Sequence, residues 1–514
     1  MLISMVLTAL TLIFPKLGFL EWISLIPFFL GVFIYCADEE KGLWRTYWCG
    51  FLTVFVYYFV VYHWFISLYP LDFIGMDNAS SVVVVIAGWI GLSVLQALPG
   101  GLIFLIFKLL QRGGVFDRTP ILRPIVLSAL WIVFEWSSTF GWTGVPWGRL
   151  CIGQSEYLPV LQSVSLLGPY LISFLLLLVN GFLAYAILNY RTLGKALLSA
   201  SLAAVLLLSN LLIGFGLMRK NDGERVTVKV AAIQGNVDMD AKGGALKELM
   251  RVYGDMTREA VAEGAQIVVW PESIFPYRMN RYTVLEDFVT ELAAECKVTL
   301  IIGALYAGED GNCYNTLYMV TPDGKLSDTL YHKRHLVPFG EYVPLRDLIR
   351  VIFPMLDQVS MLEEDVTAGD DSNLFDSKYG KVGALICFDS IYEPVVLDAV
   401  RDGAELIVIG TNDSWFFDSA GVYMHNAQAR IRACETGRYI VRSANTGVSS
   451  IIDARGNILD IEPPLQEGYV TAEVTLRSAR TLYSYVGNLF VYIAIALIAI
   501  PPVLCVYEKI RKIK

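Results

Sequence analysis

Three residues of different chemistry each follow or lie in an apolar, strand-like run. Cys387 comes directly after Val-Gly-Ala-Leu-Ile, Glu272 after Ile-Val-Val-Trp-Pro, and Lys333 lies in Tyr-His-Lys-Arg-His-Leu-Val-Pro-Phe-Gly-Glu-Tyr-Val-Pro. A thiol is a strong nucleophile only as a thiolate, so it needs a base and a nearby cation. We expect Glu272 to be the base, Lys333 to stabilise an oxyanion and Cys387 to be the nucleophile. Each residue alone could be an ordinary strand end, but their order and flanking residues favour one common site.

These segments, in this order, resemble the nitrilase (carbon–nitrogen hydrolase) superfamily. The resemblance rests on WPES, HKRHLVPFGEYVP and ICFD, and the FGEYVP form is similar to that of the apolipoprotein N-acyltransferase family, its membrane-embedded branch. The resemblance covers nearly the whole chain, because the hydrophobic segments before and after these motifs also match a membrane-embedded member of the superfamily. It implies a four-layer αββα sandwich, and it implies that Glu341 holds the lysine and assists proton movement. An exposed acidic loop residue is the alternative for Glu341.

Two places depart from the family pattern. Phe388 and Asp389 follow the cysteine where the acyltransferases usually have Tyr-Glu, and Phe-Asp is closer to soluble nitrilase-type amidases. A tryptophan often expected after Ala232–Val237 is replaced by Lys242 and Gly243. The resemblance therefore assigns no role to Asp389. It also assigns no lipid-gating role to the segment after Ala232–Val237, because the tryptophan is absent there.

The resemblance implies acyl transfer from a phospholipid to the α-amino group of S-diacylglyceryl-cysteine at a lipoprotein N-terminus. Cys387 would form a thioester, which the amine then attacks in a ping-pong cycle. We expect no metal and no organic cofactor. The first alternative is a membrane-tethered amidase that hydrolyses a C–N bond. The second is a lipid-binding or transport protein with an inactive nitrilase-like domain, against which the intact Glu272, Lys333 and Cys387 argue.

The composition is that of a membrane protein. Of 514 residues, 55 % are hydrophobic and 17 % charged, against roughly 45–50 % and 25 % in ordinary soluble domains. The net charge of −9 argues against a nucleic-acid partner. The eight cysteines show no CxxC pair, and the four histidines, with His332 and His335 beside the lysine, form no metal-binding pattern.

A helix needs about 20 residues to cross a bilayer, and the apolar segments predict about eight spans. They lie near residues 2–14, 17–36, 47–68, 81–110, 122–139, 159–189, 196–218 and 484–506. We expect a membrane bundle of about seven spans at 1–218, a nitrilase-like catalytic domain at 219–483, a last span at 484–506 and a basic cytoplasmic tail at 507–514.

Positive charges mark every second loop as cytoplasmic. They are Lys41, Arg45, Lys108, Arg112, Arg118, Arg123, Arg191, Lys195, Lys509, Arg511, Lys512 and Lys514, whereas the alternate loops carry only Lys16 and Arg149. This predicts a multi-pass protein of the bacterial cytoplasmic membrane with both termini inside and the catalytic domain on the periplasmic side. We expect a monomer whose partners are a phospholipid donor and a diacylated lipoprotein acceptor.

Residues 219–483 alternate strand-like and helix-like segments, which predicts an α/β sheet covered on both faces or packed against a second sheet. The predicted strands are 226–234, 266–270, 299–306, 316–320, 382–387 and 406–410, and the predicted helices are 244–263, 283–296 and 423–437.

Three further features stay open on the sequence alone. Leu345, Leu348, Ile349, Ile352, Phe353 and Leu356 recur at helical spacing, and this stripe could dip into the bilayer or pack on the sheet. Residues 411–417 could lie near the pocket or only fill space. In the membrane part, Glu135, Arg149 and Gln154 could be functional or could be a structural pairing.

Overall fold

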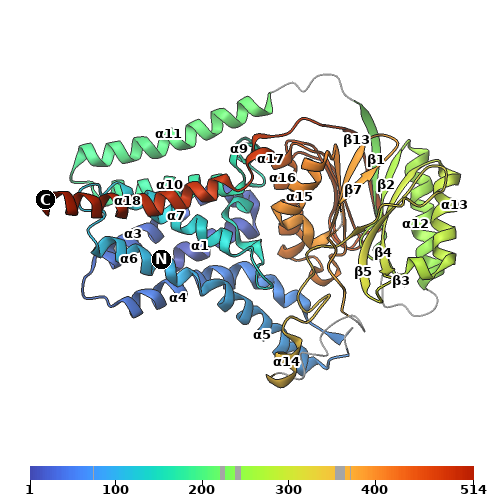
Figure 1. The fold of residues 1–514 in the computed structure, drawn as a ribbon, viewed down its shortest axis with the longest axis horizontal. Coiled ribbons are helices and arrows are strands. Elements are labelled where there is room, and N and C mark those ends of the chain that lie inside the picture. Colours follow the sequence, from blue (N-terminus) through green and yellow to red (C-terminus); the bar gives the residue numbers. More distant parts are fainter. Residues whose placement is uncertain (73–74, 220–225, 238–244, 353–364, 371, 514) are drawn as a thin grey trace. The chain divides into compact units, whose positions relative to one another are not determined.

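The chain forms two compact units in the computed structural model, which describes residues 1–72, 75–219, 226–237, 245–352, 365–370 and 372–513 (Figure 1). One unit comprises Met1–Ile66, Val85–Lys220 and Val486–Lys514, and the other comprises Ser67–Val84 and Asn221–Tyr485. The sequence places all of 1–218 in the membrane part, but residues 67–84 group with the second unit.

The first unit is helical. Its α-helices are α1 (Leu2–Ile13), α2 (Glu21–Ser24), α3 (Ile26–Ala37), α4 (Leu43–Val61), α5 (Asn78–Ala97, which begins in the second unit), α6 (Gly100–Arg112), α7 (Leu122–Ser137), α8 (Leu158–Leu161), α9 (Val164–Leu167), α10 (Pro169–Leu188), α11 (Leu193–Met218) and α18 (Leu489–Ile513); α17 (Leu482–Val486) joins the units. Short 3₁₀ turns lie at Pro15–Leu20, Tyr62–Leu68, Pro146–Gly148 and Leu150–Gln154. α7 packs against α6, α10 and α18.

Six helical stretches of the described residues are long and apolar enough to cross a membrane. They are Pro15–Ala37, Leu43–Leu68, Asn78–Arg112, Pro169–Leu188, Leu193–Met218 and Leu489–Arg511. The other two predicted spans form the 12-residue α1 and the 16-residue α7. The predicted span at 159–189 is split, because Gly168 with φ of 81° and Pro169 separate α9 from α10. The last helix starts at Leu489 and continues to Ile513, so the predicted tail is largely helical.

The second unit contains two mixed sheets. One has the order β13-β1-β2-β4-β5-β6, with β3 also paired to β4, and the other has the order β12-β11-β10-β9-β8-β7. The strands are β1 (Thr227–Gln234), β2 (Ile267–Val269), β3 (Phe275–Arg278), β4 (Thr299–Ala307), β5 (Cys313–Val320), β6 (Tyr331–His332), β7 (Leu374–Asp376), β8 (Lys381–Ile386), β9 (Leu406–Thr411), β10 (Ile440–Ala444), β11 (Ser449–Ile452), β12 (Ile458–Glu462) and β13 (Gly468–Thr475). β1, β2 and β4 run parallel, as do β8, β9 and β10.

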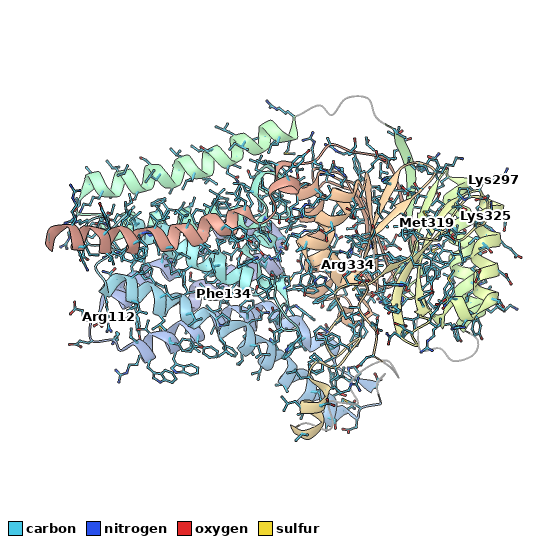
Figure 2. All side chains as sticks on the ribbon, in the orientation of Figure 1. Arg112, Phe134, Lys297, Met319, Lys325 and Arg334 are labelled. Carbon is cyan, nitrogen blue, oxygen red and sulfur yellow. The ribbon has the colours of Figure 1, made fainter. Side chains whose placement is uncertain are left out.

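The two sheets and two pairs of helices form four layers (Figure 1). α12 (Ala245–Ala262) and α13 (Thr283–Cys296) cover the first sheet, and α15 (Glu393–Asp402) and α16 (Ala420–Thr436) cover the second. One apolar core lies between the first sheet and its helices, and a second core joins the inner faces of the two sheets. Met319, labelled in Figure 2, lies in the second core. The predicted α/β domain is confirmed.

Most predicted strands and helices of this unit are observed within a few residues, α13 at its predicted bounds. One difference of a single residue matters: the predicted strand 382–387 includes Cys387 as its last residue. β8 ends at Ile386, and Cys387 opens a 3₁₀ turn, Cys387–Ile391, with a φ of 46°. A left-handed backbone is incompatible with the strand ladder, so the strand must end before the cysteine.

Candidate active site

Glu272 lies just beyond the carboxyl end of β2, where its carboxylate is almost fully buried. Gly303 of β4 permits this position: a Cβ there would lie 2.4 Å from the Pro271 carbonyl oxygen and 2.7 Å from the Glu272 Cα. The carboxylate accepts three hydrogen bonds, from Lys333 Nζ at 2.7 Å, from Asn315 Nδ2 at 2.7 Å and from the backbone N–H of Asn412 at 2.8 Å. Buried charges persist only when they are paired and hydrogen-bonded in this way.

Lys333 follows β6 and is 1 % exposed. Its ammonium lies between two carboxylates, 2.7 Å from Glu272 Oε1 and 2.9 Å from Glu341 Oε2. Burial lowers the pKa of Lys333, but the two facing carboxylates outweigh burial and raise the pKa well above its ordinary value. The lysine is therefore a fixed buried cation at neutral pH.

Glu341 and Asn315 complete this cluster. Glu341 accepts from Lys333, from the backbone N–H of Val337 at 2.8 Å and from Asn315 Nδ2 at 2.8 Å. The same Asn315 amide therefore bridges Glu272 and Glu341. Burial raises the pKa of Glu341, and the nearby Glu272 adds to the rise, while Lys333 opposes it. The sequence analysis missed Asn315, although a lone amide in the apolar strand β5 is a signal that could have pointed to it.

Cys387 is brought to the same cluster by the end of β8. Burial raises the pKa of its thiol well above the ordinary value; Glu272 raises it further, while Lys333 and a hydrogen bond with Thr411 act in the other direction. The Cys387 sulfur lies within 4.8 Å of ligand atoms of Asp413 and His425. Glu272, Lys333 and Thr411 are near enough to act on the thiol pKa. The left-handed backbone at Cys387 costs about 1–2 kcal/mol, so surrounding contacts must hold it.

The loop after β9 contacts the other groups of the site. Besides the Asn412 N–H on Glu272, Thr411 contacts the thiol and donates from Oγ1 to Asp413 Oδ1 at 3.1 Å. This loop, expected to lie near the pocket or only to pack, is therefore part of the site. Phe417, at its end, is exposed with a φ of 46°.

Asp389 has a clear structural position, which the sequence analysis could not assign. Its side chain is fully buried. From the cysteine turn, it hydrogen-bonds to a residue before Lys333 in the sequence and to a residue after it. It accepts from the Tyr331 hydroxyl at 2.8 Å and from the backbone N–H of His335 at 2.8 Å. Asp389 thus fixes the lysine segment against the cysteine turn.

Two residues near Lys333 and Glu272 in the sequence have partners outside the cluster. The Arg334 guanidinium is partly buried and pairs with Asp398 at 3.1 Å (Arg334 is labelled in Figure 2). The Trp270 ring packs between the first sheet and its helices, next to Tyr253, and its Nε1 donates to Thr257 at 3.0 Å.

Cys387, Asp413 and His425 offer sulfur, oxygen and nitrogen atoms within 4.8 Å of one another, a spacing that a metal ion could use. The sequence showed no such group because the three lie on separate elements. However, Asp413 is already paired with Arg442 at 2.5 Å and with His425 at 2.9 Å. The Asp413 carboxylate is thus already neutralised by Arg442, so these three residues are explained as an ion pair with a hydrogen-bonded histidine next to the thiol.

The apolar stripe after the lysine segment is only partly described. α14 (Arg346–Ile352) is a helix, and Leu345 and Leu348 are exposed, as is Val351. These side chains therefore do not pack on the sheet. The stripe members Phe353 and Leu356 lie outside the described residues, as do Lys242 and Gly243.

In the helical unit, Glu135, Arg149 and Gln154 are all buried. Gln154 Nε2 donates to Glu21 Oε2 at 2.7 Å, Glu135 Oε1 accepts from the backbone N–H of Leu150 at 3.0 Å, and Arg149 lies over the ring of Tyr170 at 5.3 Å. Glu21 is a buried carboxylate that the sequence analysis missed. These contacts give the three side chains partners inside the helical unit.

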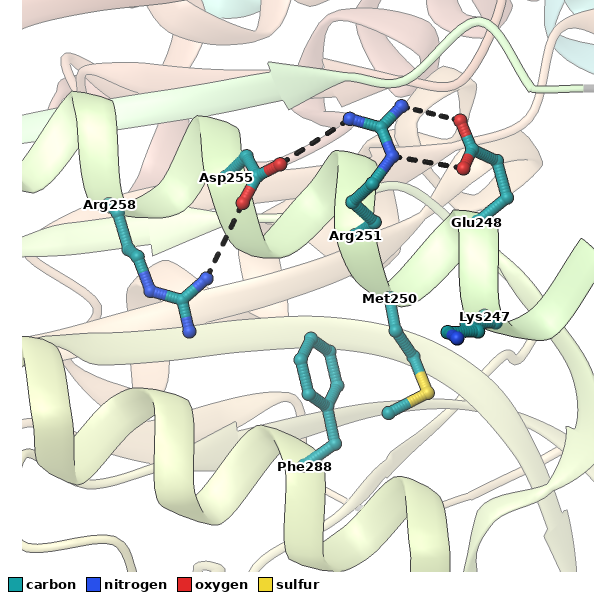
Figure 3. Close-up of a pocket in the computed structure, with 7 residues that line it drawn as sticks. All are labelled: Lys247, Glu248, Met250, Arg251, Asp255, Arg258 and Phe288. Carbon is teal, nitrogen blue, oxygen red and sulfur yellow. Dashed lines mark hydrogen bonds and ion pairs between the residues drawn. The ribbon is translucent and has the colours of Figure 1, made fainter.

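A cavity of about 430 Å³ lies between α12 and α13 (Figure 3). Its lining residues are Lys247, Glu248, Met250, Arg251, Asp255, Arg258 and Phe288. Arg251 pairs with Glu248 and Asp255, and Arg258 pairs with Asp255 and Glu295. Because its lining arginines are neutralised and it lies on the outer helices, this cavity is not part of the Cys387 site.

Comparison with known proteins gives two family matches. Residues 229–483 match carbon-nitrogen hydrolase, and residues 4–182 match the apolipoprotein N-acyltransferase N-terminal domain. Among solved structures, Nit3 of Saccharomyces cerevisiae shares 20 % identity at a TM-score of 0.38, covering 51 % of this chain and 93 % of its own. A carbon-nitrogen hydrolase of Helicobacter pylori shares 16 % identity at a TM-score of 0.40, covering 51 % and 94 %.

Two full-length relatives carry the same name. The apolipoprotein N-acyltransferase of Gloeobacter violaceus is 31 % identical over 495 residues, 95 % of this chain and 91 % of the relative. That of Geobacter metallireducens is 31 % identical over 510 residues, 96 % of this chain and 92 % of the relative. The similarity spans both units and includes the segments of Glu272, Lys333 and Cys387, so this chain belongs to the apolipoprotein N-acyltransferase family.

Proposed function

We propose that this protein transfers an acyl chain from a membrane phospholipid to the α-amino group of an S-diacylglyceryl-cysteine at a lipoprotein N-terminus. The observation that carries the proposal is a buried thiol next to a Glu272–Lys333–Glu341 cluster in a chain similar to apolipoprotein N-acyltransferases over nearly its whole length. This reaction is the last step of lipoprotein maturation. Its substrates are a phospholipid and a lipoprotein, and the enzyme is a membrane protein.

In the first half-reaction, Glu272 takes the proton from the Cys387 thiol as the sulfur attacks the ester carbonyl carbon. A C–S bond forms, the C–O bond to the glycerol oxygen breaks, and Glu272 returns the proton to that oxygen, which releases a lysophospholipid. The raised pKa of the thiol supports this role, because the thiol keeps its proton until a base removes it. Lys333 faces the oxyanion, where one fixed donor is worth about 3 kcal/mol.

In the second half-reaction, the lipoprotein amine attacks the thioester. A C–N bond forms, the C–S bond breaks, and Glu272 accepts the amine proton before it returns to the sulfur. Glu341 and Asn315 hold the base and the lysine in place during both steps, as their contacts to Glu272 and Lys333 support. No step requires a metal or an organic cofactor.

The test uses the purified full-length protein with phospholipid vesicles, first alone and then with a synthetic diacylated lipopeptide. We expect an acyl adduct on Cys387 that neutral hydroxylamine releases, followed by N-acylation of the lipopeptide on its addition, both seen by mass spectrometry. Cys387→Ala should form no adduct. Release of ammonia from amides would instead support the amidase alternative, and absence of any adduct or product would support an inactive lipid-binding domain.

We further propose the membrane organisation read from the sequence, with the membrane part at 1–218 and 484–506, the catalytic part at 219–483 and the basic end at 507–514. The 16-residue α7 packs against α6, α10 and α18, which supports treating it as a membrane span. With α1 also included, the number of membrane spans is about eight. Basic residues from several loops gather at one end: Lys108 Nζ donates to the Asp38 carbonyl at 2.7 Å, Arg112 to Glu39 at 3.1 Å, and Lys509 to Gly113 at 2.8 Å. This supports a cytoplasmic position for that end and a periplasmic one for the catalytic part, in a bacterial cytoplasmic membrane.

We also propose a monomeric working unit. One chain supplies Glu272, Lys333, Glu341 and Cys387 together, so no second copy is needed to complete the site. Light scattering of the detergent-purified protein should give the mass of one chain plus its detergent.

A further inference from the structure

The nucleophile rests on a buried network that none of the proposed catalytic steps uses. The carbonyl oxygen of Cys387 accepts from Ser390 Oγ at 2.7 Å and lies 3.3 Å from His425 Nε2. Ser390 Oγ is itself 3.1 Å from the same ring nitrogen. All three residues are buried, His425 to 1 % exposure. These contacts hold the one residue of the turn that needs a left-handed backbone, with φ of 46° at Cys387.

The other side of the imidazole is held by a charged pair. His425 Nδ1 lies 2.9 Å from Asp413 Oδ1, and Arg442 Nη2 lies 2.5 Å from Asp413 Oδ2. The Cys387 carbonyl oxygen is an acceptor only, so Nε2 carries the proton of the neutral imidazole and donates to it. Nδ1 accepts from Arg442 Nη2 at 3.1 Å, and the same Nη2 donates to Asp413, so Arg442 joins His425 to Asp413. Burial raises the pKa of Asp413, but Arg442 and His425 outweigh it and lower the pKa to about 2. The carboxylate is therefore a permanent charge under assay conditions.

Asp413 also belongs to the short loop that touches both reacting groups. Its neighbour Asn412 donates its backbone N–H to Glu272 Oε2 at 2.8 Å, and Thr411 contacts the Cys387 sulfur while donating to Asp413 Oδ1 at 3.1 Å. A displacement of residue 413 would therefore be passed to the base through residue 412 and to the thiol through residue 411.

We propose that Asp413 and His425 are positioning residues that set the Cys387 thiol and the Glu272 carboxylate relative to each other. His425 supports the backbone of the cysteine turn, and Asp413 links that support to the loop that holds the base. This inference rests on the proposed role of Cys387 as nucleophile. It adds two residues, from α16 and the loop after β9, that act on catalysis without touching the substrate.

The test compares His425→Gln with His425→Asn. The amide nitrogen of glutamine falls near the Nε2 position, so it can still reach the Cys387 carbonyl. The amide of asparagine falls near the Nδ1 position and can reach only Asp413. We expect His425→Asn to lower kcat about 10- to 100-fold with little change in KM, since a displacement of about 1 Å at a reacting group can cost 100-fold. His425→Gln should retain most of the activity.

Glu435→Gln is the matched control. Glu435 is another buried charge of α16, and it pairs with Arg432 at 2.7 Å. Its loss should lower Tm as much as the His425 variants do while leaving kcat unchanged. Asp413→Asn is the second variant; should it fail to fold, the His425 pair still decides.

The readout that a purely structural role would not move is the pH profile of Cys387 alkylation by iodoacetamide, followed on the Cys387 peptide by mass spectrometry. We expect this profile to shift in His425→Asn and to match wild type in His425→Gln and Glu435→Gln; Asp413→Asn is read by kcat alone, because the Asp413 charge itself raises the Cys387 pKa. Identical profiles in His425→Asn and His425→Gln, or a kcat loss in Glu435→Gln equal to that in His425→Asn, would overturn the proposal. Alkylation needs no lipid substrate, so it tests this network even where the acyl adduct of the proposed function fails to form.

Discussion

At the scale of single residues, the site solves the problem of keeping a buried cysteine reactive on demand. Burial is the main cause of the raised thiol pKa, and the carboxylates of Glu272 and Asp413 add to it, so the thiol holds its proton at rest. Glu272, which we propose removes the proton, is thus also one of the groups that raise the thiol pKa. The two effects of Glu272 can be separated by removing its charge.

Replacing Glu272 by Gln should have opposite effects on two reactions of Cys387. Without the negative charge, the thiol pKa should fall, because Lys333 then acts unopposed by Glu272; alkylation by iodoacetamide at pH 7 should be faster than in wild type. Acylation by phospholipid should be slower by about 100-fold or more, because nothing protonates the leaving oxygen. Both rates can be followed on the Cys387 peptide by mass spectrometry.

Glu341→Gln is the control for this prediction. Glu341 pairs with Lys333 but is not among the main groups that set the thiol pKa, so its removal should leave the alkylation profile near that of wild type. Equal alkylation profiles in Glu272→Gln and wild type would mean that Glu272 does not face the thiol.

At the scale of elements, the sequence predicted what local pattern determines. Apolar runs of Val, Ile and Leu identified β1, β2, β4, β8 and β9, and spacing identified α12, α13 and α16. The short β3, β6 and β7 carry too few residues to show a period. Asn315 and His425 were missed for a different reason: each is an ordinary polar residue on its own element, and only the tertiary fold brings Asn315 to Glu272 and His425 to Cys387.

The link between the lysine segment and the cysteine turn is also a property of elements rather than of sequence. Asp389 accepts hydrogen bonds on both sides of Lys333, from Tyr331 and from His335. We expect Asp389→Asn to lose about 1.5–3 kcal/mol of stability, because an amide offers one acceptor oxygen where the carboxylate offers two. Its kcat should fall as well, since Lys333 is no longer held against the turn. Urea unfolding and acyl-transfer kinetics measure the two effects.

Two further variants make this prediction specific. Asp389→Glu keeps both acceptor oxygens and should keep more activity than Asp389→Asn. Asp398→Asn removes the partner of Arg334 in the same segment, but that pair is partly exposed and should be worth no more than about 1 kcal/mol. Equal losses in Asp389→Asn and Asp398→Asn would show that the bridge to the cysteine turn is unimportant.

At the scale of the whole molecule, both units bury polar groups, but in different arrangements. The helical unit buries Glu21, Glu135 and Arg149 in a network of side-chain and backbone contacts, whereas the α/β unit buries its charges around a nucleophile. Exposed apolar residues occur in both units, including Leu345, Leu348 and Val351 of the segment after Glu341. Such a segment next to the lysine is suited to a substrate that arrives from a lipid phase.

The orientation of the chain in the membrane can be tested with two single cysteines. Lys325 is exposed on the α/β unit (Figure 2), and Lys195 is exposed in the first turn of α11, where the positive charges predict a cytoplasmic position. Introduced as Lys325→Cys and Lys195→Cys, they should react differently with a membrane-impermeant maleimide in spheroplasts. The Lys325→Cys thiol should be labelled at once, and the Lys195→Cys thiol only after the inner membrane is broken, with labelled peptides separated from the native cysteines by mass spectrometry. The reverse order would place the catalytic unit in the cytoplasm, where the mature N-termini of exported lipoproteins are out of reach, and labelling of both thiols in intact spheroplasts would remove the charge argument on which the orientation rests.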